Sequence, residues 1–179
     1  MSSHVVIGGQ RGSGKSTLSA SLYEMLVSMR MSVGIHEVDV YSDTIPCILG
    51  WKPWSERQKR KWAWFDPTIK KRIWEFSSDP SEIVLGDLPG KITNQFLPRM
   101  VEPAKHAVIV ARDLANLVQW ENFFEKQKIP VELRIISHRG DPPDRVNHSA
   151  PIYFINGLDR AVVSTPQVRA IAERIIDFC

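Results

Sequence analysis

The sequence predicts an α/β fold in three layers, with a mainly parallel sheet of about six strands between two layers of helices. Short apolar runs alternate along the chain with amphipathic segments of helical length, which is the pattern of parallel strands joined by helices. The 179 residues are 43% hydrophobic and 24% charged, as in an ordinary globular protein with a sizeable core. We therefore expect a single domain over residues 1–179.

The expected strands are short apolar runs at 4–8, 32–40, 82–88, 106–111, 131–137 and 152–155. Helical segments are expected at 15–30, around 93–103 and 113–128, and at 165–178. The first of these helices has apolar residues at helical spacing, namely Leu18, Leu22, Met25, Leu26 and Met29. The last begins with Thr165-Pro166, a favourable N-cap and first-turn pair.

Charge and cysteine content narrow the classes of protein. The formal net charge of +3 is too small to predict a nucleic-acid or membrane surface. Cys47 and Cys179 lie far apart without the spacing of metal ligands, which favours a reducing compartment. The start MSSHVVIGGQ has no signal-peptide or anchor pattern, and no uncharged apolar run approaches the ~18 residues of a membrane helix. We expect a cytoplasmic protein that contacts no membrane.

A phosphate-binding motif follows the first expected strand. The segment GGQRGSGKST contains G-x-x-x-x-G-K-[ST] as Gly9, Gly14, Lys15 and Ser16. Glycines let backbone N–H groups converge on phosphate oxygens where a side chain would clash. Lys15 can bridge the β- and γ-phosphates, the Ser16 hydroxyl can bind Mg²⁺, and the following helix directs its positive end at the same anion. The motif predicts that the chain binds Mg²⁺ together with ATP or GTP.

On these residues and on the order of its elements, the chain resembles the P-loop NTPase superfamily over nearly its whole length. The resemblance implies that the loop surrounds the phosphates with Gly9, Gln10, Arg11, Gly12, Ser13, Gly14, Lys15, Ser16 and Thr17. The MinD and ParA branch places a lysine directly after the first glycine, where this chain has Gln10. The loop looks closer to the G-x-x-G-S-G-K-T form of metallochaperone GTPases, molybdopterin-guanine dinucleotide accessory proteins and small-molecule kinases.

Acidic residues follow two of the expected strands. A P-loop needs a carboxylate at the end of a neighbouring strand to hold Mg²⁺ through its waters, and Asp87 in IVLGDLPG meets this need. The run from Asp87 to Gly90 looks like the D-x-x-G and D-x-P-G signatures of GTPases and of the SIMIBI class, in which the glycine amide senses the γ-phosphate. After the second expected strand, HEVDVYSDT offers Glu37, Asp39 and Asp43. An acid here orients the attacking water in the SIMIBI class and accepts the substrate proton in small-molecule kinases, so we favour Asp39, followed by Asp43.

The residues that would read the base are expected after the late strands. The fifth expected strand leads into Ser137-His138-Arg139-Gly140-Asp141. Guanine-specific enzymes carry N-K-x-D here, and the HRGD of this chain keeps the aspartate as Asp141 but lacks the asparagine. The loop 156–159, Asn-Gly-Leu-Asp, is an alternative contact. ATP and GTP both stay open.

The segment 41–81 interrupts the alternation of strands and helices. We interpret it as an insertion on the nucleotide side of the sheet, with two short basic and aromatic helices separated by Asp66-Pro67. It holds five of the six tryptophans, Trp51, Trp54, Trp62, Trp64 and Trp74, interleaved with lysines and arginines. Its tryptophans can form the small core of a helical insert. Among functional interpretations we favour a lid or acceptor-substrate pocket, then a protein-partner surface, and last a nucleic-acid groove.

Two functions from different classes follow from this pattern. In the first, the chain hydrolyses ATP or GTP and couples turnover to a partner protein or substrate, as a homodimer by analogy with SIMIBI proteins. In the second, it is a small-molecule kinase whose acceptor is held by the segment 41–81. The expected catalytic residues are Lys15, Asp39 and Asp87 in both, with Mg²⁺ held by Ser16 and Asp87. A nucleotide-gated binding module with negligible turnover is a third, non-enzymatic possibility.

Overall fold

Six parallel strands form one sheet in the part of the chain that the computed structural model describes, which is residues 2–40, 42–57, 66–138, 152–156, 158 and 161–179. The order across the sheet is β2-β3-β1-β4-β5-β6, and every neighbouring pair runs parallel. The strands are β1 (Ser3–Gly8), β2 (Val33–Glu37), β3 (Ile83–Asp87), β4 (His106–Ala111), β5 (Val131–His138) and β6 (Ile152–Asn156). All six strands were expected from the sequence, and their parallel pairing confirms the predicted α/β sheet.

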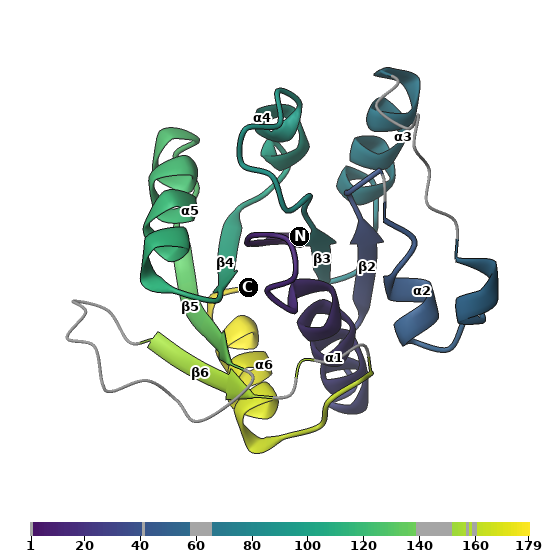
Figure 1. Cartoon of the computed structure of the whole chain (residues 1–179). Coiled ribbons are helices and arrows are strands. Elements are labelled where there is room, and N and C mark those ends of the chain that lie inside the picture. The colour runs from purple at the N-terminus through teal and green to yellow at the C-terminus, as the bar shows by residue number, and fades with distance from the viewer. Residues whose placement is uncertain (1, 41, 58–65, 139–151, 157, 159–160) are drawn as a thin grey trace.

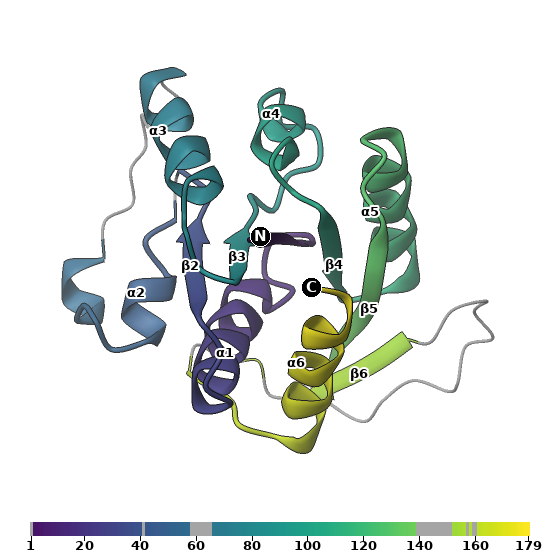
Figure 2. The same cartoon turned by 180° about the vertical axis from the view of Figure 1, so that it is seen from behind.

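Helices cover both faces of the sheet, as Figures 1 and 2 show. Side chains of successive strand residues point to opposite faces, so Val5 and Ile7 belong to one apolar cluster and Val6 to the other. The first cluster packs under α1 (Lys15–Ser28) and α6 (Pro166–Phe178). The second packs under α3 (Asp66–Ser77), α4 (Leu97–Val101) and α5 (Leu114–Lys126). The expected three-layer α/β/α arrangement is confirmed.

The helix starts follow local sequence. The Thr165 side chain caps α6 by accepting a hydrogen bond from the Val168 amide, and Pro166 occupies the first turn, as expected. Asp113 caps α5 in the same way through the Asn116 amide. The expected helix around 93–103 is shorter, because Pro98 fits only in the first turn and α4 therefore begins at Leu97.

The second expected strand is also shorter than 32–40, because the chain leaves the sheet after Glu37. The amides of Val38 and Asp39 both donate to the same carbonyl, that of Asp87, at 3.0 and 3.2 Å. Two donors on one acceptor break the regular ladder. The backbone after β2 is thereby fastened to the end of β3.

The segment between β2 and β3 is built from short elements, α2 (Ile45–Ile48), the 3₁₀ turn η1 (Trp54–Glu56) and then α3. Helix α3 carries Ile69 and Phe76 into the core. The first of the two helices expected in this segment falls largely on 58–65, outside the described residues, as do Trp62 and Trp64. The described tryptophans of this segment do not form a small core, because Trp51, Trp54 and Trp74 are 58%, 40% and 66% exposed. No helix within the described ranges has the length and apolarity needed to cross a membrane.

Candidate functional site

The loop 9–14 joins the end of β1 to the start of α1 at the carboxyl edge of the sheet. Its glycines adopt backbone conformations that other residues rarely take, with φ of 151° at Gly9, 78° at Gly12 and 84° at Gly14. A β-carbon at Gly9 would lie 1.9 Å from the Val110 carbonyl oxygen, and one at Gly14 would lie 2.6 Å from Cβ of Leu158. Sterics and backbone geometry therefore both require the glycines of the motif.

Most carbonyl oxygens of the loop accept hydrogen bonds, whereas three amides at its end have no backbone acceptor within the described ranges. The carbonyl oxygens of Gln10, Gly12, Ser13, Gly14 and Lys15 accept hydrogen bonds from, in order, the Ser13 amide, Arg112 Nε, Ser137 Oγ, the Leu18 amide and Ser19 Oγ. Within the described ranges, the amides of Gly14, Lys15 and Ser16 donate to no other backbone group. These amides stand at the N-terminus of α1, where the helix dipole favours an anion. Three consecutive amides are thus left without a backbone acceptor before any anion binds.

Ser16 and Asp87 meet beside this loop. The Ser16 hydroxyl donates to Asp87 Oδ2 at 2.6 Å, and the Asp87 carboxylate is 1% exposed. Burial raises the pKa of Asp87 above its ordinary value and the charge of Asp39 adds to this, while the Lys15 ammonium and the Ser16 hydrogen bond oppose it. Lys15 is itself 8% exposed. The structure therefore brings together Lys15, Ser16 and Asp87, the last two of which are 71 residues apart in the sequence.

The donor set fits Mg²⁺. Asp87 Oδ1 is buried and has no hydrogen-bond partner among the described residues, so it is available to accept from a metal-bound water. The Ser16 hydroxyl, on the other oxygen of the same carboxylate, is a hard oxygen ligand of the kind that Mg²⁺ prefers. These two residues would hold the ion jointly with phosphate oxygens.

Gly90 lies against the phosphate loop. A β-carbon at Gly90 would stand 2.6 Å from the backbone nitrogen of Arg11 and 2.8 Å from its Cα. Because Ile7 pairs with Asp87 in the register of β1 and β3, the segment after β3 and the loop after β1 leave the sheet side by side. Gly90 therefore lies beside Arg11 of the phosphate loop, whose side chain is exposed.

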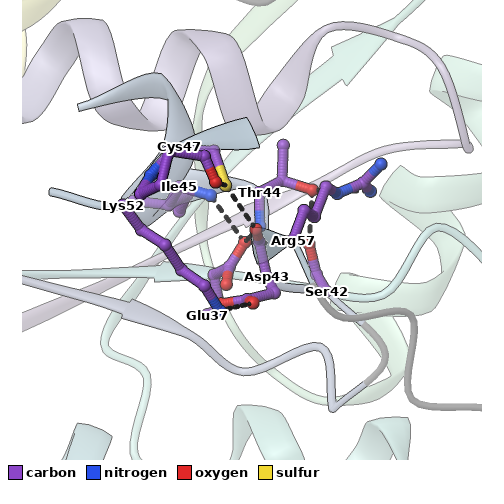
Figure 3. Close-up of polar contacts among 9 residues, drawn as sticks. Glu37, Ser42, Asp43, Thr44, Ile45, Cys47, Lys52 and Arg57 are labelled. Atoms are coloured by element: carbon purple, nitrogen blue, oxygen red, sulfur yellow. Dashed lines mark hydrogen bonds and ion pairs between the residues drawn. The ribbon is translucent and has the colours of Figure 1, made fainter. Parts of the chain in front are cut away.

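Two of the acids after β2, Glu37 and Asp43, have different surroundings, shown in Figure 3. Glu37 is 6% exposed, and its Oε1 accepts from the Ser42 hydroxyl at 2.8 Å and from the amides of Thr44 and Ile45 at 2.6 and 2.7 Å. Burial raises the pKa of the Glu37 carboxyl, and these hydrogen bonds oppose that rise only in part. Glu37 thus closes the loop that follows β2.

Asp39 and Asp43 lie on the loop that Glu37 closes. Asp39 is half-buried, and its amide donates to the Asp87 carbonyl, which places it at the same edge as the phosphate loop. Asp43 pairs with the Lys52 ammonium, and its carbonyl accepts from the Cys47 thiol (Figure 3). Arg57 donates to Thr44 Oγ1 at 2.9 Å. Asp39 is therefore linked to Asp87 by a backbone hydrogen bond, whereas Asp43 forms an ion pair with Lys52.

The base-reading side of the site is described in part. Asp141 lies outside the described residues. Strand β6 ends at Asn156, and Leu158 of the loop after it packs against Gly14. The His138 ring at the end of β5 stacks on Phe154 of β6 with centroids 5.8 Å apart.

Sequence reasoning did not identify three residues that shape the site, namely Glu37 as a loop anchor, and Arg112 and Ser137 as donors to the phosphate loop. Arg112 immediately follows the apolar run of β4, and Ser137 ends the apolar run of β5. Because parallel strands end at one edge of a sheet, their position at the ends of expected strands was the available signal. Their partners, 100 and 124 residues away, depend on strand order.

Solved structures share this fold at low sequence identity. The structure matches the septum site-determining protein MinD complexed with Mg-ADP from Pyrococcus horikoshii, with a TM-score of 0.62 and 16% identity over 80% of this chain and 75% of that one. It matches a cobyrinic acid a,c-diamide synthase from Mycobacterium smegmatis, with bound ATP analog and magnesium, with a TM-score of 0.61 and 13% identity over 98% and 92% of the two chains. It also matches a GTPase from Pyrococcus abyssi in its apo form, with a TM-score of 0.52 and 15% identity over 75% and 66%.

No protein-family model and no curated protein sequence matches the chain. The three solved structures share the parallel α/β fold of this chain. The similarity is one of fold, because the identities are all below one residue in five.

Proposed function

From the P-loop NTPase fold of this chain, we propose that it binds a nucleoside triphosphate, ATP or GTP, with Mg²⁺ and hydrolyses it. The observation that carries the proposal is the phosphate loop, whose carbonyls are held while the amides of Gly14, Lys15 and Ser16 face no backbone acceptor in the described ranges. A second cluster, Lys15 with Ser16 and Asp87, lies directly beside it.

Binding rests on charge and on preorganised donors. Amides at the start of α1 and the Lys15 ammonium would neutralise the β- and γ-phosphates. Ser16 and Asp87 would hold Mg²⁺, which would supply positive charge to neutralise the phosphate oxygens. Because Asp87 is 1% exposed, its field acts with little screening by water.

Hydrolysis needs a group that orients water opposite the leaving phosphate. We assign this role to Asp39, which is half-buried and whose charge acts on Asp87. A water oxygen forms the new bond to the γ-phosphorus while the bond to the β–γ bridging oxygen breaks, and the electron pair stays on the diphosphate. Asp39 accepts a hydrogen bond from the water and takes up its proton.

We further propose that turnover is coupled to a partner protein or substrate, or to a second copy of the chain. The exposed tryptophans support a contact surface, since Trp51 and Trp54 lie on the segment after β2 together with Arg57, whose guanidinium stands over the Trp54 ring at 5.8 Å. Tryptophan and arginine are enriched in binding hot spots.

A phosphotransferase is the second candidate function, and the network in Figure 3 favours it. Lys52 and Arg57 bring two cations onto the loop that carries Asp39. An acceptor hydroxyl or carboxylate held there would receive the γ-phosphate in place of water, and Asp39 would accept the proton of a hydroxyl acceptor.

One assay separates the two. The purified chain is mixed with γ-labelled ATP or GTP and Mg²⁺, with and without a metabolite extract. Slow release of inorganic phosphate without extract supports hydrolysis, whereas label transferred only to a small molecule supports the phosphotransferase and contradicts the hydrolase.

The variant Asp39→Asn tests the assigned role in the same assay. We expect turnover to fall by about 100-fold or more, with triphosphate affinity changed by less than about threefold, because an amide cannot take up the proton. Asp177→Asn, an exposed change on α6, is the control. Equal turnover of Asp39→Asn and the parent would remove Asp39 from the mechanism.

A further inference from the structure

Two side chains outside the phosphate-loop motif hold consecutive carbonyls of that loop. Arg112, directly after β4, donates from Nε to the Gly12 carbonyl at 2.8 Å. Ser137, near the end of β5, donates from Oγ to the Ser13 carbonyl at 2.6 Å. Both donors approach from the β4 and β5 side of the loop.

The backbone geometry of the loop makes these contacts matter. In a concave set of amides the N–H groups converge, so the carbonyls of the same peptides turn outward and need donors elsewhere. The loop supplies some donors itself, since the Ser13 amide bonds the Gln10 carbonyl and the Leu18 amide bonds that of Gly14. Gly12 and Ser13 instead receive their donors from distant strands.

Arg112 also brings charge to the loop. Its terminal nitrogen lies 2.9 Å from the position of a β-carbon at Gly12, so the guanidinium rests on the backbone of the outer turn. No carboxylate within the described ranges forms an ion pair with Arg112, so this positive charge is not neutralised by the protein there. A polyphosphate in the loop would lie within the field of this cation as well as that of Lys15.

We propose that Arg112 and Ser137 are positioning residues for the phosphate site. Ser137 fixes the outward direction of the Ser13 carbonyl and so keeps the Gly14 amide of the same peptide aimed at the anion. Arg112 fixes the Gly12 carbonyl in the preceding turn and adds positive charge beside the loop. This inference rests on the proposed nucleotide binding. Loss of either donor weakens binding even though no side chain of the motif has changed.

Calorimetric titration with non-hydrolysable ATP and GTP analogues and Mg²⁺ tests the proposal. We expect Ser137→Ala and Arg112→Gln each to weaken binding about three- to tenfold, the scale of one lost hydrogen bond. Ser137→Thr keeps the hydroxyl and restores affinity to within about twofold of the parent. Arg112→Lys keeps the charge but not the Nε donor, so it recovers only part of the affinity.

Matched controls are Ser28→Ala, whose hydroxyl bonds only locally on α1, and Arg174→Gln on the exposed face of α6. They should bind as the parent does. The double variant Ser137→Ala/Arg112→Gln should lose less affinity than the product of the single losses, because both donors order the same short loop.

The titrations distinguish failure of this inference from failure of the proposed function. Parent-like affinity in both Ser137→Ala and Arg112→Gln, with the parent chain binding nucleotide, overturns this inference and leaves the proposed function intact. A loss in Ser137→Ala that Ser137→Thr does not rescue also overturns it. Failure of the parent chain to bind either analogue overturns the proposed function and this inference together.

Discussion

At the scale of single residues, Asp87 shows the conflict between stability and function most clearly. Its carboxylate is buried, one of its oxygens has no partner within the described ranges, and burial raises its pKa. In the ligand-free protein an ionised group in such a place costs free energy, which Lys15 and Ser16 offset only in part. The proposed magnesium site beside the phosphate loop would explain why the group is there.

We expect Asp87→Asn to increase the free energy of unfolding of the ligand-free protein at a pH of about 7.5, because the raised pKa of Asp87 means that its ionised form is disfavoured in the folded state. The same substitution should weaken Mg²⁺-dependent nucleotide binding by more than about tenfold, because an amide is a poor partner for metal-bound water. Urea denaturation and calorimetry measure the two effects, with Asp177→Asn as the exposed control.

The stability difference between Asp87→Asn and the parent protein depends on pH. Because the folded-state pKa of Asp87 is raised, the parent protein gains stability as pH falls through that value, and the gain is complete below the unfolded-state pKa. The difference between Asp87→Asn and the parent therefore shrinks from neutral toward acid pH. A difference that is constant or grows at lower pH contradicts the buried, raised carboxyl.

Much of the site could be predicted at this scale, and the reason is chemical. The phosphate loop needs fixed residue types at fixed spacing, so Gly9, Gly14, Lys15 and Ser16 stand out in the sequence alone. Asp87 could be predicted because it ends an apolar run. Arg112 and Ser137 could not be assigned to the loop, since a single arginine or serine after a strand has no pattern of its own. Asp141 remains a prediction.

At the scale of elements, the junction of the phosphate loop and the loop after β3 is a tight contact beside the site. Gly90 leaves no room for a β-carbon beside the Arg11 backbone. Gly50 has the opposite character, with φ of 71° and nothing within 4 Å of a β-carbon. Substitution of Gly90 therefore tests steric contact at the site, and substitution of Gly50 tests backbone strain away from the site.

We therefore expect Gly90→Ala to weaken Mg²⁺-nucleotide binding by about tenfold or more. The added methyl group would force the Arg11 backbone out of its position in the phosphate loop. Gly50→Ala should instead cost about 1–2 kcal/mol of stability, with nucleotide affinity unchanged. Calorimetry and thermal unfolding of both variants give the comparison. Unchanged affinity in Gly90→Ala would show that the two loops do not act together.

Helix α3 supplies a second test of the elements. Phe76 is fully buried, with its ring edge-on to His4 at 5.1 Å between centroids, whereas Trp74 on the same helix is 66% exposed. We expect Phe76→Ala to lower the free energy of unfolding by about 3–5 kcal/mol and Trp74→Ala by less than about 0.5 kcal/mol. Denaturant unfolding measures both. Similar losses would mean that α3 is not part of the core beside β2 and β3.

The elements were predictable where hydrophobic period decides them. All six strands were expected, with ends that differ by a few residues, because apolar runs between polar loops are a strong signal. The segment 41–81 was harder. Its tryptophans suggested a small core, but an aromatic side chain has the same identity whether it is buried or exposed, and Trp51, Trp54 and Trp74 are exposed.

At the scale of the whole molecule, one topological fact creates the site. Strand β1 lies between β3 and β4, so the phosphate loop stands between Asp87 on one side and Arg112 on the other. Chain reversal at the centre of an open parallel sheet places ligands at this edge. The three-layer fold was predictable from the alternation of elements. The strand order that brings these residues together was not, because it depends on pairing between strands that are distant in the chain and no local pattern specifies it.

The most direct test of the central claim, that this edge binds a polyphosphate, is equilibrium dialysis of the whole chain against ATP and GTP with Mg²⁺. We predict that the parent chain retains at least one of the two, and that Lys15→Ala loses affinity by at least about 100-fold while exposed Lys126→Ala does not. Retention of neither nucleotide by the parent chain, or equal retention by Lys15→Ala, would contradict the claim.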